Sequence, residues 1–301
     1  MIDGNFSLRG LWASDPELRA GLALLRLPQL DGLSFGRGAF REQIRPGVSA
    51  TLAAVTESQG EHRRFWESEA ANWLAWARTP GHDAYWDYAQ AFFRDIVPEP
   101  SGRTLEIACG EGRVSRDLRA HGHDVYSIDG APTLIRAAAE ADEHHRRYVL
   151  ADAAKLPFAE GSFHCVVAYN ALMDMDDMPT TVLEAGRVLR TGGRMCICVT
   201  HPMIDAGRFE AREADARFII DRDYLAGSTV DEPFERAGLR IRFRGRTWPL
   251  QAYSMALESA GFVIERIREP RQRAEAVAKD PAEHRWQRLP NFLLIRAVKA
   301  R

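Results

Sequence analysis

The segment TLEIACGEGRVSRDL, residues 104–118, most constrains what this chain can fold into. A short apolar run ends at two closely spaced glycines, Gly110 and Gly112, and a pattern typical of a helix begins at once. Glycine lets the backbone approach a ligand where a side chain would clash. A strand that passes through such a loop into a helix is typical of nucleotide-like ligands, which bind at the helix N-terminus. The segment therefore predicts an α/β protein with a ligand site after its first strand.

The chain beyond this segment alternates between strand-like and helix-like patterns. We expect strands at residues 104–109, 124–128, 147–150, 163–168, 193–200, 262–267 and 291–298, and helices near 112–121, 132–141, 178–190 and 249–260. Such alternation predicts a doubly wound, mostly parallel sheet with helices on both faces.

Two regions depart from the alternation. Residues 1–58 carry no motif, and we expect an N-terminal extension of helix and loop, of unknown role, before a main domain at 59–301. Residues 202–247 interrupt the pattern, and their runs ARFIIDRDYL and GLRIRFRGRTW are expected to form an inserted pair of strands that caps the site. The insert is rich in arginine, and we expect its arginines to face solvent: Arg208, Arg240, Arg242 and Arg244. If they point inward instead, they indicate an acceptor that carries a carboxylate or phosphate.

Composition excludes several classes of protein. The 301 residues are 46% hydrophobic and 27% charged with a net charge of −2, as in an ordinary globular protein, so neither a nucleic-acid nor a membrane-surface partner is indicated. No run approaches the ~18–20 apolar residues of a membrane span, and the N-terminus lacks the apolar core of a signal peptide. The four cysteines form no CxxC pair and are expected to be reduced. A cytoplasmic location is therefore expected.

Carboxylates near the glycines narrow the choice of ligand. Glu106 in the strand and Glu111 in the loop would repel a pyrophosphate but favour a ligand that carries an ammonium and a sulfonium. A dinucleotide fingerprint would also have glycine where Ser115 stands, which weakens the case for NAD. An acid inside an apolar strand needs a partner, so we favour a ligand role for Glu106. For Glu111 alone we expect a solvated side chain.

Two further acids stand at the ends of the next two strands. Asp129 lies 19 residues after Gly110, where a carboxylate can accept both ribose hydroxyls of a nucleoside. Asp152 can accept the exocyclic amine of an adenine, with the N–H of Ala153 directed to the ring. A role as a plain helix N-cap is a compatible alternative for Asp152.

These motifs resemble those of class I S-adenosylmethionine-dependent methyltransferases of the small-molecule kind, over residues 60–298. The resemblance lies in LEIACGEG, VYSIDGAPTLIRAA, LADAAKLPFAEGSFHCVVAYNAL, EAGRVLRTGGRMCICV and WPLQAYSMALESAGFVIERIREP. It implies a seven-stranded sheet whose last strand is antiparallel, and S-adenosyl-L-methionine as the cofactor. The residues then expected to bind the cofactor are Glu106, Ala108, Gly110, Gly112, Asp129, Gly130, Asp152, Ala153 and Asn170.

The chain also departs from the family pattern. Thr191 stands where the family usually has proline, and AYNALMD replaces the Asn/Asp-Pro-Pro-aromatic signature of enzymes that methylate base amines. No nucleic-acid partner is therefore expected. The acids of DMDDM (Asp174, Asp176 and Asp177) precede a predicted helix, whose dipole favours negative charge, so we expect no metal there.

Methyl transfer from a sulfonium is an in-line displacement, which needs a base only if the acceptor must lose a proton. His201 follows the fifth strand and is our candidate base, with Tyr169 and, more weakly, His82 as further polar groups. The alternative for each histidine is a structural, hydrogen-bonded role at a turn. We therefore expect a methyltransferase that acts on oxygen, nitrogen or carbon of a small organic acceptor, with its oligomeric state open. An NAD-dependent oxidoreductase and a non-catalytic relative that binds the cofactor are the alternatives.

Overall fold

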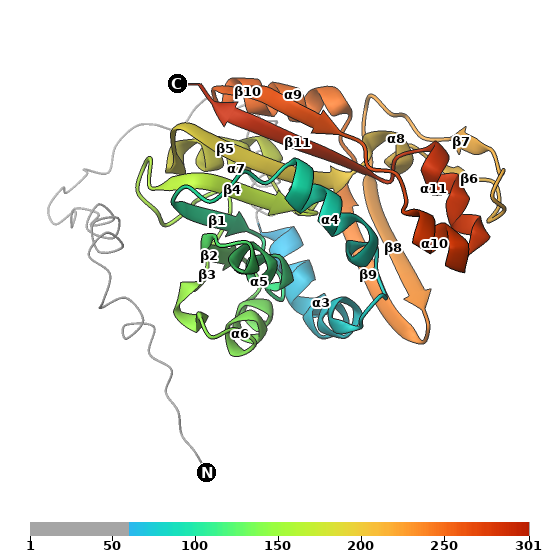
Figure 1. Cartoon of the computed structure of the whole chain (residues 1–301), viewed down its shortest axis with the longest axis horizontal. Coiled ribbons are helices and arrows are strands. Elements are labelled where there is room, and N and C mark those ends of the chain that lie inside the picture. The colour runs from blue at the N-terminus through green and yellow to red at the C-terminus, as the bar shows by residue number, and fades with distance from the viewer. Residues whose placement is uncertain (1–59, 301) are drawn as a thin grey trace, which may run out of the picture.

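A seven-stranded sheet forms the centre of the molecule in a computed structural model, which describes residues 60–300 (Figure 1). The predicted extension at 1–58 lies outside the described residues. The strand order is β10-β11-β5-β4-β1-β2-β3. The strands are β1 (Arg103–Ile107), β2 (Asp124–Asp129), β3 (Tyr148–Leu150), β4 (Phe163–Tyr169), β5 (Leu189–Thr200), β10 (Phe262–Arg268) and β11 (Phe292–Lys299). The last strand, β11, is antiparallel to both neighbours, which confirms the predicted sheet.

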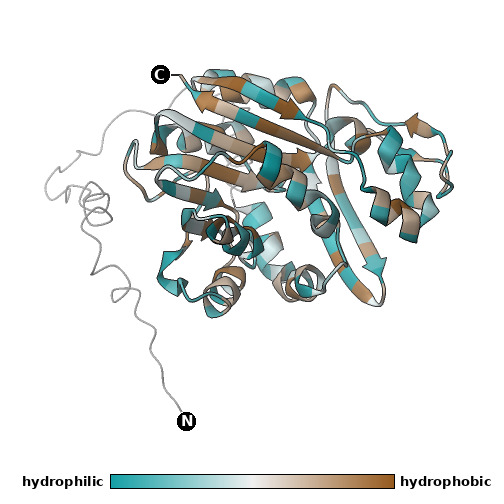
Figure 2. Cartoon of the chain, viewed as in Figure 1, coloured by the Kyte–Doolittle hydropathy of each residue, from teal (hydrophilic) through white to brown (hydrophobic). Residues whose placement is uncertain are grey.

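Helices cover both faces of the sheet, also as predicted (Figure 1). They are α3 (Glu61–Arg78), α4 (Tyr85–Asp95), α5 (Arg113–Ala120), α6 (Pro132–Glu140), α7 (Met178–Val188) and α9 (Leu250–Ser259). Side chains of α7 and α9 share one apolar cluster with the sheet, and those of α4 and α5 share another. The central strands are apolar on both faces because both are covered, as Figure 2 shows. None of the helices between residues 60 and 300 is long and apolar enough to cross a membrane.

The insert after β5 consists of a short helix and two separate hairpins. It contains α8 (Pro202–Asp205), β6 (Gly207–Phe209), β7 (Phe218–Ile220), β8 (Thr229–Arg236) and β9 (Leu239–Arg246). Strand β6 pairs with β7, and β8 pairs with β9. Both predicted strands of the insert are present, as β7 and β9, but they belong to different hairpins. Each has a nearer partner just before it in the chain, and a short loop closes at lower entropic cost.

The arginines of the insert only partly face solvent. Arg208 and Arg240 have side chains that are 70% and 81% exposed, as expected. Arg244 differs, because its guanidinium bonds Asp231 and Glu61 at 2.7 and 2.9 Å and lies over the ring of Phe65. This arginine thus joins hairpin β8–β9 to α3, which lies beside it in Figure 1. The chain after β10 adds α10 (Ala274–Lys279) and α11 (Arg285–Arg288).

The start of α3 is held by a loop that is distant in sequence. The carboxylate of Asp176, just before α7, accepts hydrogen bonds from the N–H groups of Gly60 and His62 at 2.8 and 3.1 Å. Its neighbour Asp177 caps its own helix α7, by accepting from the N–H of Thr180 at 3.0 Å. Two acids of the DMDDM run are thus helix caps, and one of them anchors a different helix from the one that follows it.

Removal of this remote cap should loosen α3 specifically. Replacement of Asp176 by alanine leaves two N–H groups of the first turn without their acceptor, at a cost of ~0.5–2 kcal/mol. Amide hydrogen exchange should therefore accelerate in α3 and not in α7, whereas Asp177→Ala, the matched control, should do the opposite. Unchanged exchange in α3 of the Asp176 variant would show that the cap does not hold the helix.

Candidate active site

The glycine loop after β1 turns sharply into α5. Ala108, Gly110 and Gly112 have φ angles of 53°, 55° and 84°, in the left-handed region that glycine tolerates best. A Cβ atom at Gly112 would also lie 2.9 Å from Oη of Tyr148 and 3.0 Å from Cβ of Ala138. The second glycine is therefore required both by its φ and by close packing against neighbouring elements.

Asp129 at the end of β2 is bonded directly to this loop. Its Oδ2 accepts from the N–H of Gly110 and its Oδ1 from the N–H of Ala131, both at 2.8 Å. The side chain is 8% exposed, and burial raises its pKa while the backbone N–H groups lower it. Each carboxylate oxygen can accept a second hydrogen bond, so capacity remains for ribose hydroxyls.

Glu106 has a partner inside the protein. It is 2% exposed, and the hydroxyl of Ser115, at the start of α5, donates to its Oε2. The same hydroxyl lies 2.6 Å from Oγ of Ser127 on β2. Burial raises the pKa of Glu106 to about 8, and the hydrogen bond from Ser115 opposes that rise. The carboxyl group is therefore mostly protonated at neutral pH.

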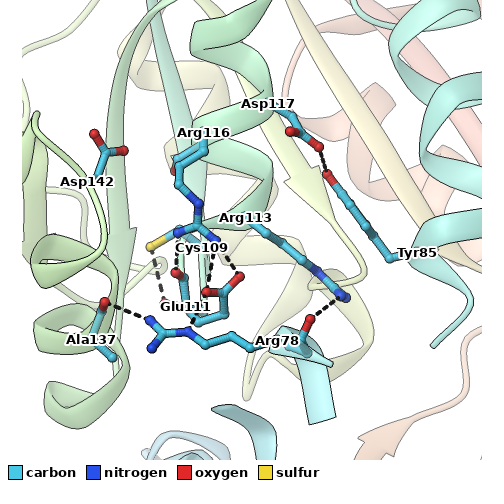
Figure 3. Close-up of polar contacts among 12 residues, drawn as sticks. Arg78, Tyr85, Cys109, Glu111, Arg113, Arg116, Asp117, Ala137 and Asp142 are labelled. Atoms are coloured by element: carbon cyan, nitrogen blue, oxygen red, sulfur yellow. Dashed lines mark hydrogen bonds and ion pairs between the residues drawn. The ribbon is translucent and has the colours of Figure 1, made fainter. Parts of the chain in front are cut away.

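Glu111 is not the solvated side chain that the sequence analysis expected. It is 2% exposed and lies between two guanidinium groups, as Figure 3 shows. Nε of Arg78 in α3 donates to it at 3.0 Å, and Nη2 of Arg116 in α5 donates to both of its oxygens at 2.9 Å. That expectation is wrong because Arg78, which is distant in the sequence, and Arg116 of the helix after the loop both bond Glu111 and offset the cost of burial.

The other predicted contacts gather at the same edge of the sheet. Asp152 follows β3 and accepts from the N–H of Ala154 at 2.9 Å, which stabilises a turn. No helix lies between β3 and β4, so the alternative role as a helix N-cap is wrong. Ala153 beside it is 8% exposed. Asn170 follows β4 with a φ of 49°, and its side-chain oxygen accepts from Sγ of Cys198 at 3.5 Å. The positions of these three residues are compatible with the cofactor-binding roles predicted for them, and each role stays a prediction.

Helix α3 lies against this edge, and the aromatic pattern of residues 60–95 had predicted helices that cover the cofactor. A Cβ atom at Gly130 would lie 2.9 Å from Cδ of Arg63, and one at Gly110 would lie 3.0 Å from Nε1 of Trp73. Nη1 of Arg63 is also 3.6 Å from Oδ2 of Asp152. The aromatic run at 65–76 was the available signal, but nothing in it shows which strand tips the helix would cover.

The three candidate catalytic residues differ in the contacts that their side chains make. Nε2 of His201 is 2.9 Å from Oε1 of Glu269, and its Nδ1 accepts from the N–H of Met203 at 3.2 Å, so both ring nitrogens have partners. Tyr169 packs edge-on against Tyr85 at 5.4 Å. His82 lies 4.3 Å from the ring of Trp76. Among the described residues, Oη of Tyr169 and Nε2 of His82 have no hydrogen-bond partner.

The contacts of His201 match the structural alternative for this residue. With Nδ1 as acceptor, Nε2 carries the proton and donates to Glu269. Its role as a base stays a prediction, and it would require one of these two bonds to break.

The pKa of Glu106 predicts a pH dependence of stability. In an unfolded chain this carboxyl group has a pKa near 4.5, and in the fold about 8. The folded state therefore binds the proton more tightly, so this contribution is full below pH 4.5 and is lost as the pH rises through 8. The melting temperature should fall less between pH 6 and pH 9 in Glu106→Gln than in the wild type, as measured by circular dichroism. Parallel curves would show that Glu106 is ionised in the fold.

Residues 105–197 match the family described as Methyltransferase domain. The demethylmenaquinone methyltransferase of Beutenbergia cavernae is 33% identical over 121 residues, which are 39% of this chain and 48% of that protein. The biotin biosynthesis bifunctional protein BioHC of Saccharophagus degradans is 29% identical over 172 residues, 56% of this chain and 28% of that protein. The chain thus spans half or less of the length of these curated relatives.

Solved structures share the fold over most of its length. An S-adenosylmethionine-dependent methyltransferase from Mesorhizobium loti has 25% identity and a TM-score of 0.56, and the match covers 72% of this chain and 98% of that one. A similar protein from Listeria monocytogenes, at 18% identity and a TM-score of 0.55 over 70% and 99% of the two chains, shows the fold alone. Residues 105–197 thus carry a methyltransferase domain, and the described chain has the fold of class I S-adenosylmethionine-dependent methyltransferases.

Proposed function

We propose that the chain transfers the methyl group of S-adenosyl-L-methionine to a small organic acceptor. The observation that supports this most is the direct bond between Asp129 and Gly110, which brings the acid of β2 to the glycine loop of β1. A ribose that lies on the loop would then meet the carboxylate without any rearrangement of these two strands.

The residues present fit this cofactor. Asp129 would accept from the ribose hydroxyls, Asp152 from the adenine amine, and the N–H of Ala153 would donate to the ring. The left-handed backbone at Gly110 and Gly112 permits close approach of a ligand. The cofactor supplies an activated methyl group on a sulfonium, and the chain's own residues orient the acceptor and exclude water.

The structure supports a different argument against NAD from the one that the sequence offered. Glu111 is neutralised by Arg78 and Arg116 and would repel a pyrophosphate less than the sequence suggests. Ser115 carries the argument instead, because it stands at the third glycine position of the dinucleotide fingerprint and its hydroxyl is committed to Glu106.

The relatives' names support a small acceptor without identifying it. One name refers to demethylmenaquinone and another to biotin biosynthesis, so these two relatives serve different small-molecule chemistry. We therefore propose the acceptor class only, and a cytoplasmic location stays a prediction.

Calorimetric titration with S-adenosylhomocysteine and with NAD tests the cofactor assignment. The first should bind, and Asp129→Ala should weaken it by ~2–4 kcal/mol if two buried hydrogen bonds are lost. Asp124→Ala is the matched control, since Asp124 begins the same strand at its far end and pairs with Arg147. Tighter binding of NAD, or unchanged affinity in the Asp129 variant, would contradict the assignment.

The contacts of α3 predict a gain of affinity on one substitution. Arg63 contacts Gly130 and approaches Asp152, and both charged side chains are about half exposed (46% and 50%). Such an exposed pair contributes only ~0–1 kcal/mol, so its displacement by a ligand costs little. Arg63→Ala should leave S-adenosylhomocysteine affinity equal or up to about fivefold higher by the same titration. A large loss would mean that Arg63 binds the cofactor itself.

Catalysis is tested separately from binding. Incubation of the full chain with methyl-labelled S-adenosylmethionine and a cell extract should transfer label to a low-molecular-weight product. Cofactor binding without any transfer would favour a non-catalytic relative.

A further inference from the structure

Two side chains with unused donors lie beside the glycine loop. Trp73 belongs to α3, and Arg113 is the first residue of α5. A Cβ atom at Gly110 would lie 3.0 Å from Nε1 of Trp73. The central guanidinium carbon of Arg113 lies over the same indole, 5.2 Å from the centre of its ring. The two side chains therefore lie against each other where α3 meets the loop.

Arg113 is held in place by several elements. Its Nη1 lies 2.7 Å from Oδ2 of Asp83, in the turn before α4, and 3.5 Å from the carbonyl oxygen of Ala77 in α3. Its guanidinium also lies over the ring of Tyr85, at 4.2 Å from the centre. The side chain is only 15% exposed. A guanidinium fixed in this way loses little conformational entropy when a ligand binds it.

Both side chains keep donors that no other group uses. The two polar contacts of Arg113 both involve Nη1, and its Nε and Nη2 donate to no residue in the described part of the chain. Nε1 of Trp73 also donates to none of those residues, although the ring is partly buried. None of these three nitrogens is among the sealed polar atoms of residues 60–300, so each keeps surface open to a ligand. Donors this close to the interior usually have partners, so the three together indicate a site that a ligand with acceptor oxygens completes.

The acids of the loop do not compete for Arg113. Glu111 is already bonded by Arg78 and Arg116, as Figure 3 shows. Asp129 accepts from two backbone N–H groups. Each acid thus has its own donors, and a ligand carboxylate can bond Arg113 without displacing either of them.

The strand order gives the direction in which the proposed cofactor would run. The proposed contacts place adenine at Asp152 after β3 and ribose at Asp129 after β2, and the next strand of the sheet is β1. Neighbouring strands lie about 4.8 Å apart, so each step along the strand ends spans roughly one part of the ligand. The amino-acid end is joined through sulfur to the ribose, on the side away from adenine. It would therefore reach the tip of β1, where Gly110, Trp73 and Arg113 meet.

We infer that Trp73 and Arg113 bind the carboxylate at the amino-acid end of the cofactor, which makes α3 a part of the cofactor site. This inference rests on the proposed function and assigns a part of the cofactor that Asp129 and Asp152 do not contact. A carboxylate has two acceptor oxygens and no donor, and it matches the paired N–H groups of a guanidinium edge. The indole N–H supplies one further donor to the same group.

Arg63 is another cation that α3 directs to this edge, and its position assigns it to the opposite end of the ligand. It contacts Gly130, which follows β2, and approaches Asp152, which follows β3. These contacts lie at the nucleoside end of the proposed cofactor. Arg63 is therefore one to two strands away from the carboxylate and does not replace Arg113 as its partner.

A pair of ligands that differ in the carboxylate tests the inference without any change to the protein. The full chain is titrated calorimetrically with S-adenosylhomocysteine and with its decarboxylated form, which keeps the adenosine, the sulfur and the amine. S-adenosylhomocysteine should bind at least about tenfold more tightly, because the other compound lacks the charge-assisted hydrogen bonds to a fixed guanidinium. Equal affinity would overturn the inference and leave the proposed function in place. Binding of neither compound would overturn both.

Variants then locate the preference in the two side chains. Arg113→Gln should reduce the preference for the carboxylate form about tenfold, and Trp73→Phe, which keeps an aromatic ring against the loop, about threefold. Arg113→Lys should keep part of it, since the charge remains but the paired N–H groups are lost. In each variant the affinity for the decarboxylated form should stay within about twofold of the wild type. An equal loss of both ligands would show that the side chains only support the fold, and would overturn the inference.

Two further substitutions serve as matched controls. Trp66→Phe removes the same N–H group from the same helix, at an indole 5.9 Å from that of Trp73, and so reports any general loosening of α3. Arg147→Gln removes a guanidinium that pairs with Asp124 at the opposite end of β2. Neither control should change the preference for the carboxylate. A change in either as large as in the Trp73 or Arg113 variants would attribute the preference to helix packing or to overall charge, and would overturn the inference.

Discussion

The carboxylate of Asp129 joins the ends of β1 and β2 at the edge where the ligand site lies. Parallel pairing places Ile107 opposite Ile128, so the residues that follow both strands emerge together. The two N–H groups that reach Asp129 come from the glycine loop and from the turn before α6. Because one side chain satisfies both, the loop, the turn and the starts of two helices share a single anchor. The positions of the other site residues depend on this anchor.

Three buried acids lie around the loop, and the fold stabilises each in a different way. Glu106 is hydrogen-bonded to a hydroxyl and holds its proton, Glu111 lies between two guanidinium groups, and Asp129 accepts from backbone N–H groups. Their formal charges therefore overstate the field that a ligand meets. Recognition at this edge depends more on directed hydrogen bonds than on net negative charge.

The order and type of the main elements followed from sequence because each is a local pattern. The apolar runs and the helix signals between them predicted all seven strands of the sheet within a few residues. The acids at the strand ends were placed correctly for the same reason, since parallel strands bring their carboxyl ends to one edge. Asp129 next to Gly110 is the clearest case.

Contacts between distant segments were not predictable in this way. The burial of Glu111 depends on Arg78, which is 33 residues away in the chain and looks like an ordinary surface residue of a helix. The position of α3 depends on Asp176, a cap supplied from 116 residues away.

Helix α3 is attached to its surroundings by apolar side chains and also by charged groups, and the charged groups have a consequence for measurement. Arg63 approaches Asp152, Arg244 of the hairpin bonds Glu61, and Asp176 lies beside His62. These pairs are at least partly open to water, where dissolved salt screens charge with a Debye length of about 8 Å at physiological ionic strength. Added salt therefore weakens the attachment of α3 while leaving the apolar sheet intact. Ionic strength thus affects the charged part of this attachment, and affinities at this edge are comparable only at matched salt concentration.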